Sequence, residues 1–233
     1  MNVDQSPILI TGIPRSGASM IAGVINLCGA FGGDMTYRKG TYENGAIQRF
    51  IEDGFLQSMG ADPSGQFPLP VVESIPVNWR KLVESQLLVE GYTSGCWMYK
   101  SSRASLIWQI WHNAFPDAKW VIVRRRTADV IQSCIKTGYM KAFKDENNLK
   151  LVQAITESEG WLWMVHKYEE KFVEMITEGL NCKVVWPERM VTGDYKQIYE
   201  TIEWLGLDWK SDALNFVDPL LWGSRQKQKR RAS

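Results

Sequence analysis

A glycine-rich segment near the start of the chain, GIPRSGAS, contains the residue types that bind anions. Gly12 and Gly17 allow backbone amides to approach an anion closely, and Ser16 and Ser19 add hydroxyl donors. Arg15 adds a full positive charge with planar donors. An apolar run precedes the segment and a helical pattern follows it, so a helix N-terminus would face the anion. We therefore predict a phosphate-binding loop rather than an ordinary strand–turn–helix junction.

The same segment departs from the loop of nucleoside triphosphatases. That loop carries a lysine directly before its hydroxyl residue, and Ala18 occupies this position here. Magnesium binding also needs an acidic residue after another strand, whereas the other predicted strands end near Lys100 and Arg124. We therefore expect a smaller anion, held by cationic side chains without a metal.

A second cationic motif, VIVRRRTADVIQS, follows another apolar run. Arg125 stands at the predicted strand end, and Asp129 and Ser133 follow it on a predicted helix. The guanidinium and the hydroxyl can hold one phosphate between them. The alternative is a solvated basic cluster at the start of a helix.

Four short apolar runs predict the strands that position these motifs: 7–11, 96–100, 120–123 and 183–186. Other segments predict helices at 18–28, 46–59, 79–90, 104–115, 127–136, 145–178 and 194–205. Strands that alternate with helices form a parallel sheet. We therefore predict an α/β fold, a three-layer P-loop-type domain with a central parallel sheet flanked by helices. Ligands bind such sheets at the carboxyl ends of the strands, where both cationic motifs fall.

The bulk composition is that of one globular domain. The chain has 233 residues, of which 45% are hydrophobic, and a net charge of +1. We assign residues 1–233 to a single domain with a basic tail at 223–233. The charge argues against a nucleic-acid partner, and no apolar run reaches the roughly 18–20 residues of a membrane span. Scattered cysteines and no secretory leader predict a cytoplasmic protein with reduced thiols.

The cationic motifs resemble those of sulfotransferases that use 3′-phosphoadenosine 5′-phosphosulfate (PAPS). The loop, with its arginine before Ser-Gly, is similar to the family's 5′-phosphosulfate loop. The spacing of Arg125, Asp129 and Ser133 is similar to the family's 3′-phosphate motif. A third segment, MYKSSRASL, resembles the strand-ending lysine motif in its Lys-Asp-Pro-Arg form, through Lys100 and Arg103. The resemblance covers most of the chain, from the loop through Ser133.

This resemblance implies a P-loop fold, PAPS as the donor co-substrate and no metal. It implies that the donor contacts Pro14, Arg15, Ser16, Gly17, Ala18, Ser19, Arg125 and Ser133. It also implies that Lys100 or Arg15 stabilises charge on the leaving oxygen. The acceptor would be a hydroxyl of a carbohydrate or a small molecule, and we expect the loops at 30–45 and 60–70 to build its pocket.

The departures from the family concern mainly the general base. Ala18 and Ser19 stand where family members commonly carry two threonines. Ser102 stands where the Lys-x-His form of the strand-ending motif has its histidine base. The two histidines of the chain, His112 and His166, lie inside predicted helices rather than at strand ends. We therefore expect the base to come from another segment.

Glu43 is the predicted base, in the segment GTYENGAIQRF that follows the glycine-rich loop. Many sulfotransferase-like proteins outside the histidine group place a glutamate in such a segment. The alternative for Glu43 is a helix-leading acid favoured by the helix dipole. Glu52 and Asp53 are weaker candidates, because both lie within the predicted helix.

Two other functions fit parts of the pattern. A P-loop kinase or other nucleotide phosphotransferase would bind Mg²⁺ and ATP, but the missing lysine and acidic strand end count against it. A degenerate, non-catalytic nucleotide-binding module fits the Ala18 substitution and the missing histidine.

Two features outside the motifs add further expectations. Four tryptophans are candidates for the wall of an adenine or acceptor pocket, with a place in the core as the alternative: Trp79, Trp204, Trp209 and Trp222. The basic tail lacks the family's Arg-x-Gly-x-x-Gly pattern, so we expect it to be a disordered charged tail rather than a nucleotide contact.

Overall fold

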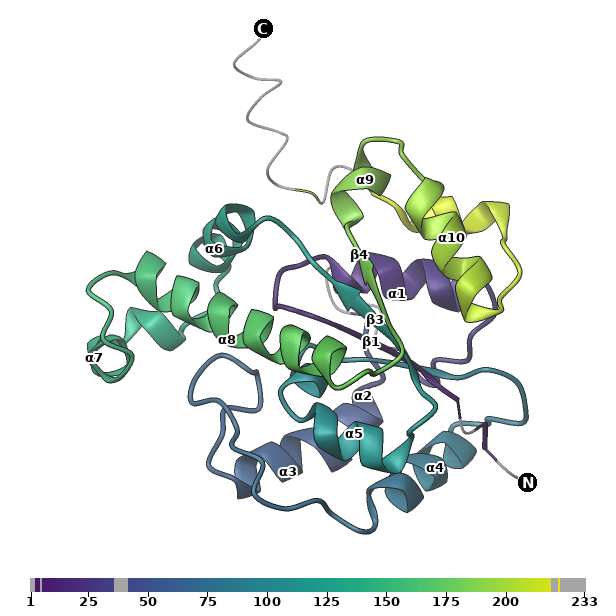
Figure 1. Cartoon of the computed structure of the whole chain (residues 1–233), viewed down its shortest axis with the longest axis horizontal. Coiled ribbons are helices and arrows are strands. Elements are labelled where there is room, and N and C mark those ends of the chain that lie inside the picture. Colours follow the sequence, from purple (N-terminus) through teal and green to yellow (C-terminus); the bar gives the residue numbers. More distant parts are fainter. Residues whose placement is uncertain (1–2, 5, 36–41, 219–221, 223–233) are drawn as a thin grey trace, which may run out of the picture.

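A parallel sheet forms the centre of the computed structural model, which describes residues 3–4, 6–35, 42–218 and 222 (Figure 1). Its strands in this part of the chain are β1 (Ile8–Gly12), β2 (Met98–Lys100), β3 (Lys119–Val123) and β4 (Cys182–Val185). They lie in the order β2-β1-β3-β4 and all run parallel. Ile10 pairs with Lys100 on one side and with Val121 on the other. The predicted strands all form and make one sheet.

Helices cover both faces of this sheet because successive strand residues point to opposite sides. Ile8 and Ile10 face a cluster with α1 (Ala18–Leu27), α9 (Pro187–Val191), α10 (Lys196–Leu205) and the 3₁₀ turn η4 (Ser211–Phe216). Leu9 faces a cluster with α4 (Trp79–Val89), α5 (Trp108–Ala114), α6 (Thr127–Lys136) and α8 (Glu157–Thr177). Figure 1 shows α9 and α10 above the strands and α4 and α5 below them. The predicted three-layer α/β fold is confirmed.

The helix predicted at 46–59 contains a π-helical turn. α2 (Gly45–Ile47) leads into the π turn η1 (Gln48–Glu52), and α3 (Asp53–Ser58) follows. The Asp53 amide bonds to the carbonyl of Gln48, five residues back, so this turn is one residue wider than an α-helical turn. Glu52, at its end, is completely buried.

The region predicted as helical at 145–178 consists of two helices. α7 (Glu146–Leu151) ends several residues before α8 begins. Gln153, between them, has a φ of 58°, in the left-handed region that interrupts a helix. Thr156 then caps α8, because its hydroxyl accepts from the Glu159 amide while the Glu159 side chain accepts from the Thr156 amide. The short 3₁₀ turns η2 (Arg103–Ser105) and η3 (Ala142–Lys144) lie in connections.

The carboxyl ends of the strands bring the predicted motifs to one edge of the sheet. β1 leads into the loop at 13–17, β2 ends at Lys100, and β3 leads into Arg124 and Arg125. The chain leaves β1 toward β2 on one side and later returns to β3 on the other, which is the place where such sheets bind ligands. Residues 36–41 of one predicted acceptor loop and the basic tail at 223–233 lie outside the described residues.

None of the helices in the described residues has the length and apolar character needed to cross a membrane.

Candidate active site

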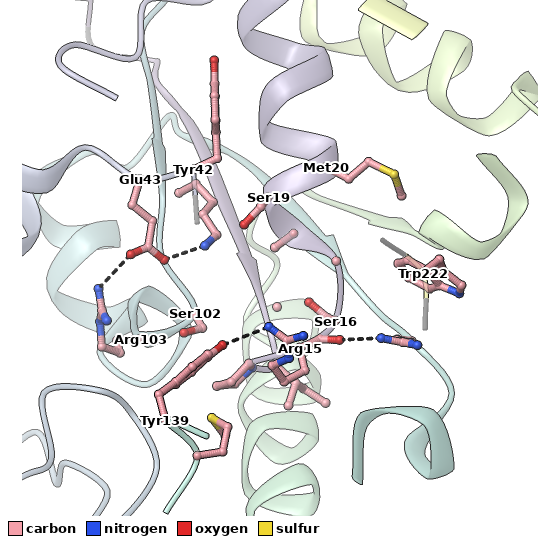
Figure 2. Close-up of a pocket in the computed structure, with 18 of the residues that line it drawn as sticks. Arg15, Ser16, Ser19, Met20, Tyr42, Glu43, Ser102, Arg103, Tyr139 and Trp222 are labelled. Atoms are coloured by element: carbon pink, nitrogen blue, oxygen red, sulfur yellow. Dashed lines mark hydrogen bonds and ion pairs between the residues drawn. The ribbon is translucent and has the colours of Figure 1, made fainter. Parts of the chain in front are cut away.

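A cavity of about 530 Å³ opens at the carboxyl edge of the sheet (Figure 2). Its walls come from the loop after β1, the segment before α2, the start of η1, the loop at 60–70 and the ends of β2 and β3. The turn after α6 and the end of η4 with the residues after it complete them. The predicted site residues among its walls are Pro14, Arg15, Ser16, Gly17, Ala18, Ser19, Glu43, Lys100 and Arg125. Ser133 does not line the cavity, but it is hydrogen-bonded to Arg15, which does.

The loop after β1 packs tightly against β3. A Cβ atom at Gly12 would lie 2.5 Å from the carbonyl oxygen of Val123 and 2.6 Å from Ser16 Oγ, so only glycine fits there. Arg15 (φ 75°) and Gly17 (φ 95°) have left-handed backbone, which turns the chain into α1. The first amides of α1 therefore face the cavity without intrahelical acceptors.

The Ser16 hydroxyl adds a donor to this cradle. It is buried and has no hydrogen-bond partner among the described residues. A buried hydroxyl without a partner is costly, and a bound anionic oxygen would satisfy it. The loop therefore fits a phosphate or sulfate group.

Arg15 connects the two predicted phosphate motifs. Its Nε donates to Ser133 Oγ at 2.9 Å, and its Nη1 donates to the Tyr139 hydroxyl at 3.1 Å. Its carbonyl oxygen accepts a hydrogen bond from Arg125 Nη1 at 3.1 Å. Arg15, Arg125 and Ser133 thus form one cationic corner beside the loop.

Trp222 covers this cationic corner. Its ring lies 4.1 Å from the guanidinium carbon of Arg125, and a Cβ atom at Gly17 would lie 2.7 Å from the ring. Burial lowers the pKa of Arg125, and the carboxylates of Asp129 and Glu188 offset part of this effect. An arginine whose pKa starts so high stays protonated, so the corner remains cationic.

The other three tryptophans considered as pocket walls do not line this cavity. Trp79 is buried and packs edge-on against Trp111, with the ring centroids 5.4 Å apart. Trp204 and Trp209 pack against the cluster on the α1 side of the sheet. Trp79 therefore belongs to the core.

Glu43 lies at the other end of the cavity, against Lys100. Lys100 Nζ donates to Glu43 Oε1 at 2.5 Å, and Arg103 Nη2 lies 3.9 Å from Glu43 Oε2 (Figure 2). The next residue, Asn44, holds this segment, because its side chain caps α2. Burial raises the pKa of Glu43, but the charges of Lys100 and Arg103 outweigh it, so the net pKa is lowered. Glu43 is therefore ionised at neutral pH.

Glu52 lies behind this pair and does not line the cavity. It is fully buried and accepts a hydrogen bond from Arg103 Nε at 2.9 Å. Glu52 cannot contact a substrate in the cavity, so it is a weaker candidate for the general base than Glu43, as the sequence indicates. Its link to Arg103 escaped sequence reasoning, because the π turn that buries it has no local sequence signal.

The histidines lie away from the cavity. His166 is exposed on α8, and His112 is half-buried on α5. Ser102 lines the cavity at the position where the Lys-x-His form has its histidine. In the described part of the chain, no three histidine, cysteine or acidic side chains gather in a way that could hold a metal ion.

Sequence reasoning missed several cavity residues: Gln48, Tyr139, Asn215 and Asp218. Tyr42 and Ser64 also line the cavity, and they lie in the loops at 30–45 and 60–70 expected to build the acceptor pocket. Gln66 connects two of their segments, because its Nε2 donates to Ser64 Oγ at 2.8 Å and to the Tyr139 carbonyl at 3.1 Å. It ties the predicted acceptor loop at 60–70 to the turn that holds Arg15. The segments of Gln48, Tyr139, Asn215 and Asp218 carry no motif, so only the tertiary structure places these residues at the cavity.

Solved sulfotransferase structures have the same fold as this chain. Sulfotransferase STF9 from Mycobacterium avium matches with a TM-score of 0.61 and 12% identity, over 97% of this chain and 70% of its own. The sulfotransferase domain from the curacin biosynthetic pathway has a TM-score of 0.60 and 13% identity, over 93% and 79%. The sulfotransferase domain from the Synechococcus PCC 7002 olefin synthase has a TM-score of 0.55 and 15% identity, over 96% and 92%.

No family model matches the chain, and no curated protein matches it. At identities this low, the structural likeness shows the fold alone. The predicted sulfotransferase-type P-loop fold is confirmed at that level.

Proposed function

We propose that this protein is a sulfotransferase that moves a sulfuryl group from PAPS to an acceptor hydroxyl of a carbohydrate or a small molecule. One observation carries the proposal: an anion-binding loop and a carboxylate–lysine pair line the same cavity. The fold shared with solved sulfotransferases supports it. We further propose that the reaction needs no metal and that the protein works in the cytoplasm.

The donor would be held along the cationic side of the cavity. The α1 amides, Ser16 and Ser19 would bind the 5′-phosphosulfate, and Arg125 would bind the 3′-phosphate. Ser133, which lies outside the cavity wall beside Arg15, would contact the 3′-phosphate from the same corner. Arg15 reaches both places, because its backbone belongs to the loop while its side chain bonds to Ser133.

The transfer itself is a displacement at sulfur. The acceptor oxygen forms a bond to sulfur, and the bond between sulfur and the bridging oxygen of the 5′-phosphate breaks. The bridging oxygen keeps the electron pair and leaves as part of 3′,5′-bisphosphoadenosine, and the acceptor proton passes to Glu43. Lys100 and Arg15 would stabilise the negative charge that develops on the leaving oxygen.

The charged surroundings of Glu43 support the proposed role of this residue as base. Lys100 and Arg103 keep it ionised, so it is ready to accept a proton throughout the neutral range. The same cations make it a weak base, so it would accept the proton only as the attacking oxygen loses electron density to sulfur. In this position Glu43 removes the proton and so prevents reversal of the attack.

Two rival functions are the alternatives to this proposal. A nucleotide phosphotransferase would need Mg²⁺ and a lysine in the loop, and Ala18 stands in the lysine position. A nucleotide-binding module without catalysis would use the same cationic corner and leave the Glu43–Lys100 pair without a role.

Isothermal titration calorimetry distinguishes these functions. We expect 3′,5′-bisphosphoadenosine to bind at least about tenfold more tightly than ADP, a difference of about 1.4 kcal/mol, with or without Mg²⁺. Equal affinities, or a requirement for Mg²⁺, would overturn the proposal in favour of a phosphotransferase. Release or transfer of sulfate from ³⁵S-labelled PAPS then separates an enzyme from a non-catalytic module.

A further inference from the structure

Glu52 is a fully buried carboxylate with an uneven set of partners. One oxygen, Oε2, accepts from the Tyr99 hydroxyl at 3.0 Å, from Ser101 Oγ at 2.6 Å and from Arg103 Nε at 2.9 Å. The other oxygen, Oε1, is buried and has no hydrogen-bond partner among the described residues. A buried carboxylate is costly unless it is paired, so the Arg103 charge is what keeps Glu52 in this place.

Arg103 is held between two carboxylates. Its Nε bonds to Glu52, while its Nη2 lies 3.9 Å from Glu43 Oε2. Its backbone amide donates to Ser101 Oγ at 3.1 Å, so the residue is fixed at both ends. Figure 2 shows the guanidinium directed toward Glu43. Arg103 is almost fully buried, so solvent screens these contacts little.

The π turn explains how Glu52 reaches this position. Its extra residue rotates the following side chains around the helix axis relative to an α-helix. Gln48, at the start of the turn, lines the cavity, whereas Glu52, at its end, points into the protein beside β2. Such turns are frequent at functional sites, and here one connects the cavity wall to a buried charge.

We propose that Glu52 is a positioning residue for the reaction centre, which acts through Arg103 on Glu43. It holds the guanidinium at its distance from Glu43 and balances its charge, so that Glu43 can still accept a proton. This inference rests on the proposed role of Glu43 as the base.

The charge balance around Glu43 supports this role. Lys100 and Arg103 carry two positive charges, and Glu43 and Glu52 carry two negative charges. Without the negative charge of Glu52, the two cations would act more strongly on Glu43 and would lower its pKa further. Other titratable groups that face the cluster are Tyr99, Tyr168 and Asp53. Burial raises the pKa of Tyr168 well above its ordinary value, so its hydroxyl stays neutral. Burial and the neighbouring carboxylates raise the pKa of Tyr99 well above its ordinary value, so it stays a neutral donor.

Asp53, at the start of α3, is the carboxyl group among them. Burial raises its pKa to about 6, and Glu52 and Glu43 raise it as well, against the opposing charge of Arg103. Asp53 is therefore mostly ionised at pH 7.5, where kcat is measured, and mostly protonated at the lower pH where Glu43 titrates.

The test replaces Glu52 with glutamine, which keeps the shape and removes the charge. Carbon-13 NMR of glutamate-labelled protein follows the Glu43 carboxyl, and Glu43→Gln assigns its signal. In Glu52→Gln we expect the Glu43 titration to move to lower pH by about one unit. For hydrolysis of PAPS at pH 7.5, with water as acceptor, we expect kcat to fall about three- to tenfold and the KM for PAPS to stay within about twofold.

Two further variants make the result decisive. Arg103→Lys keeps a cation, but a lysine cannot bond to Glu52 and face Glu43 at once, so the Glu43 titration should move to higher pH. This shift is opposite in direction to the one expected for Glu52→Gln. It tests the connection from Glu52 through Arg103 to Glu43 even if Glu52→Gln fails to fold. Glu157→Gln is the matched control, because Glu157 is a partly buried glutamate that bonds to Trp161 Nε1 at 3.0 Å, away from the cavity. It should change neither the Glu43 titration nor kcat.

A folded Glu52→Gln protein with the wild-type Glu43 titration and wild-type kcat would overturn the inference. If the wild-type protein does not bind 3′,5′-bisphosphoadenosine, the proposed function fails instead. The Glu43 titration needs no nucleotide, so it separates the two failures.

Discussion

Arg15 Nε donates a hydrogen bond to Ser133 Oγ at 2.9 Å and so joins residues 118 positions apart in the chain. Arg15 comes from the loop after β1, and Ser133 comes from α6, after β3. β1 and β3 are neighbours in the sheet, so the two motifs meet at their carboxyl ends. The Tyr139 hydroxyl accepts a second bond from the same guanidinium, which fixes its orientation.

Replacement of Ser133 by alanine tests this corner. The hydroxyl orients Arg15 and is the proposed ligand of the 3′-phosphate, so its loss should weaken binding of 3′,5′-bisphosphoadenosine about tenfold. Adenosine 5′-phosphosulfate, which has no 3′-phosphate, should lose less affinity. Calorimetry measures both, with Ser58→Ala as a control at an exposed serine. Equal losses for both ligands would contradict the assignment of Ser133 to the 3′-phosphate.

Glu43→Gln tests the proposed base. The amide keeps the size of the side chain but cannot take a proton, so kcat for sulfate transfer should fall by about 10²–10⁴. Affinity for 3′,5′-bisphosphoadenosine should stay within about twofold, because Glu43 lies at the other end of the cavity from the cationic corner. Near wild-type turnover would remove Glu43 from the mechanism.

The residues that could be predicted from the sequence are those with local signals. Gly12 ends a buried strand, Arg15 and Gly17 follow it within one short segment, and Arg125 follows another strand. The α/β alternation then places the ends of these strands at one edge of the sheet. For that reason the fold and most of the cavity's cationic residues could be derived before the structure.

The remaining features depend on contacts between distant segments. The stacking of Trp222 on Arg125 joins residue 222 to the segment after β3, and no spacing rule predicts it. The burial of Glu52 follows from the π turn, which an ordinary helical pattern conceals. The break at Gln153 is similar, because a left-handed residue other than glycine leaves no signal in the sequence.

Lys100→Met should change the pH dependence of the reaction. In the wild type, Lys100 and Arg103 overcome the effect of burial and keep the pKa of Glu43 below its ordinary value of 4.5. Turnover should therefore not depend on Glu43 protonation between about pH 5 and 7. Without Lys100, burial becomes dominant, so the pKa rises and turnover should decline as the pH falls through this range.

Lys100→Met should also lower the stability of the protein at neutral pH. Because the pKa of Glu43 is lower in the folded chain than in the unfolded chain, this residue stabilises the fold at any pH above the unfolded-state pKa. The stabilisation is lost as the pH falls through the folded-state pKa. Lys100→Met should lose this contribution at pH 7, and its melting temperature should fall relative to the wild type. An unchanged pH profile together with an unchanged melting temperature would contradict the importance of the ion pair.

Asp53→Asn should stabilise the protein at neutral pH but not in acid. Burial raises the pKa of Asp53 from 3.8 to about 6, and its Oδ1 has no hydrogen-bond partner among the described residues. The folded chain thus holds this proton more tightly, and the resulting stability is present below pH 3.8 and is lost as the pH rises through about 6.

The asparagine mimics the protonated form, so the melting temperature at pH 7.5 should rise by about 1–2 °C and should match the wild type near pH 4. Differential scanning calorimetry at these two pH values measures the change in melting temperature. Asp117→Asn, at an exposed position, is the control. A melting temperature below that of the wild type at pH 7.5 would show that the charge of Asp53 stabilises the fold.

Gly17→Ala, compared with Gly29→Ala, separates backbone strain from the contact with Trp222. Both glycines have positive φ, 95° and 111°, so alanine should cost about 1–2 kcal/mol of folding free energy at either site. A Cβ atom at Gly29 would have no atom within 4 Å, whereas one at Gly17 would lie 2.7 Å from the Trp222 ring. Gly17→Ala must therefore displace Trp222 from Arg125 or distort the loop. We expect it to weaken binding of 3′,5′-bisphosphoadenosine by at least about tenfold, while Gly29→Ala keeps wild-type affinity. If calorimetry gives equal affinities for two folded variants, neither the backbone of the loop nor the position of Trp222 contributes to nucleotide binding.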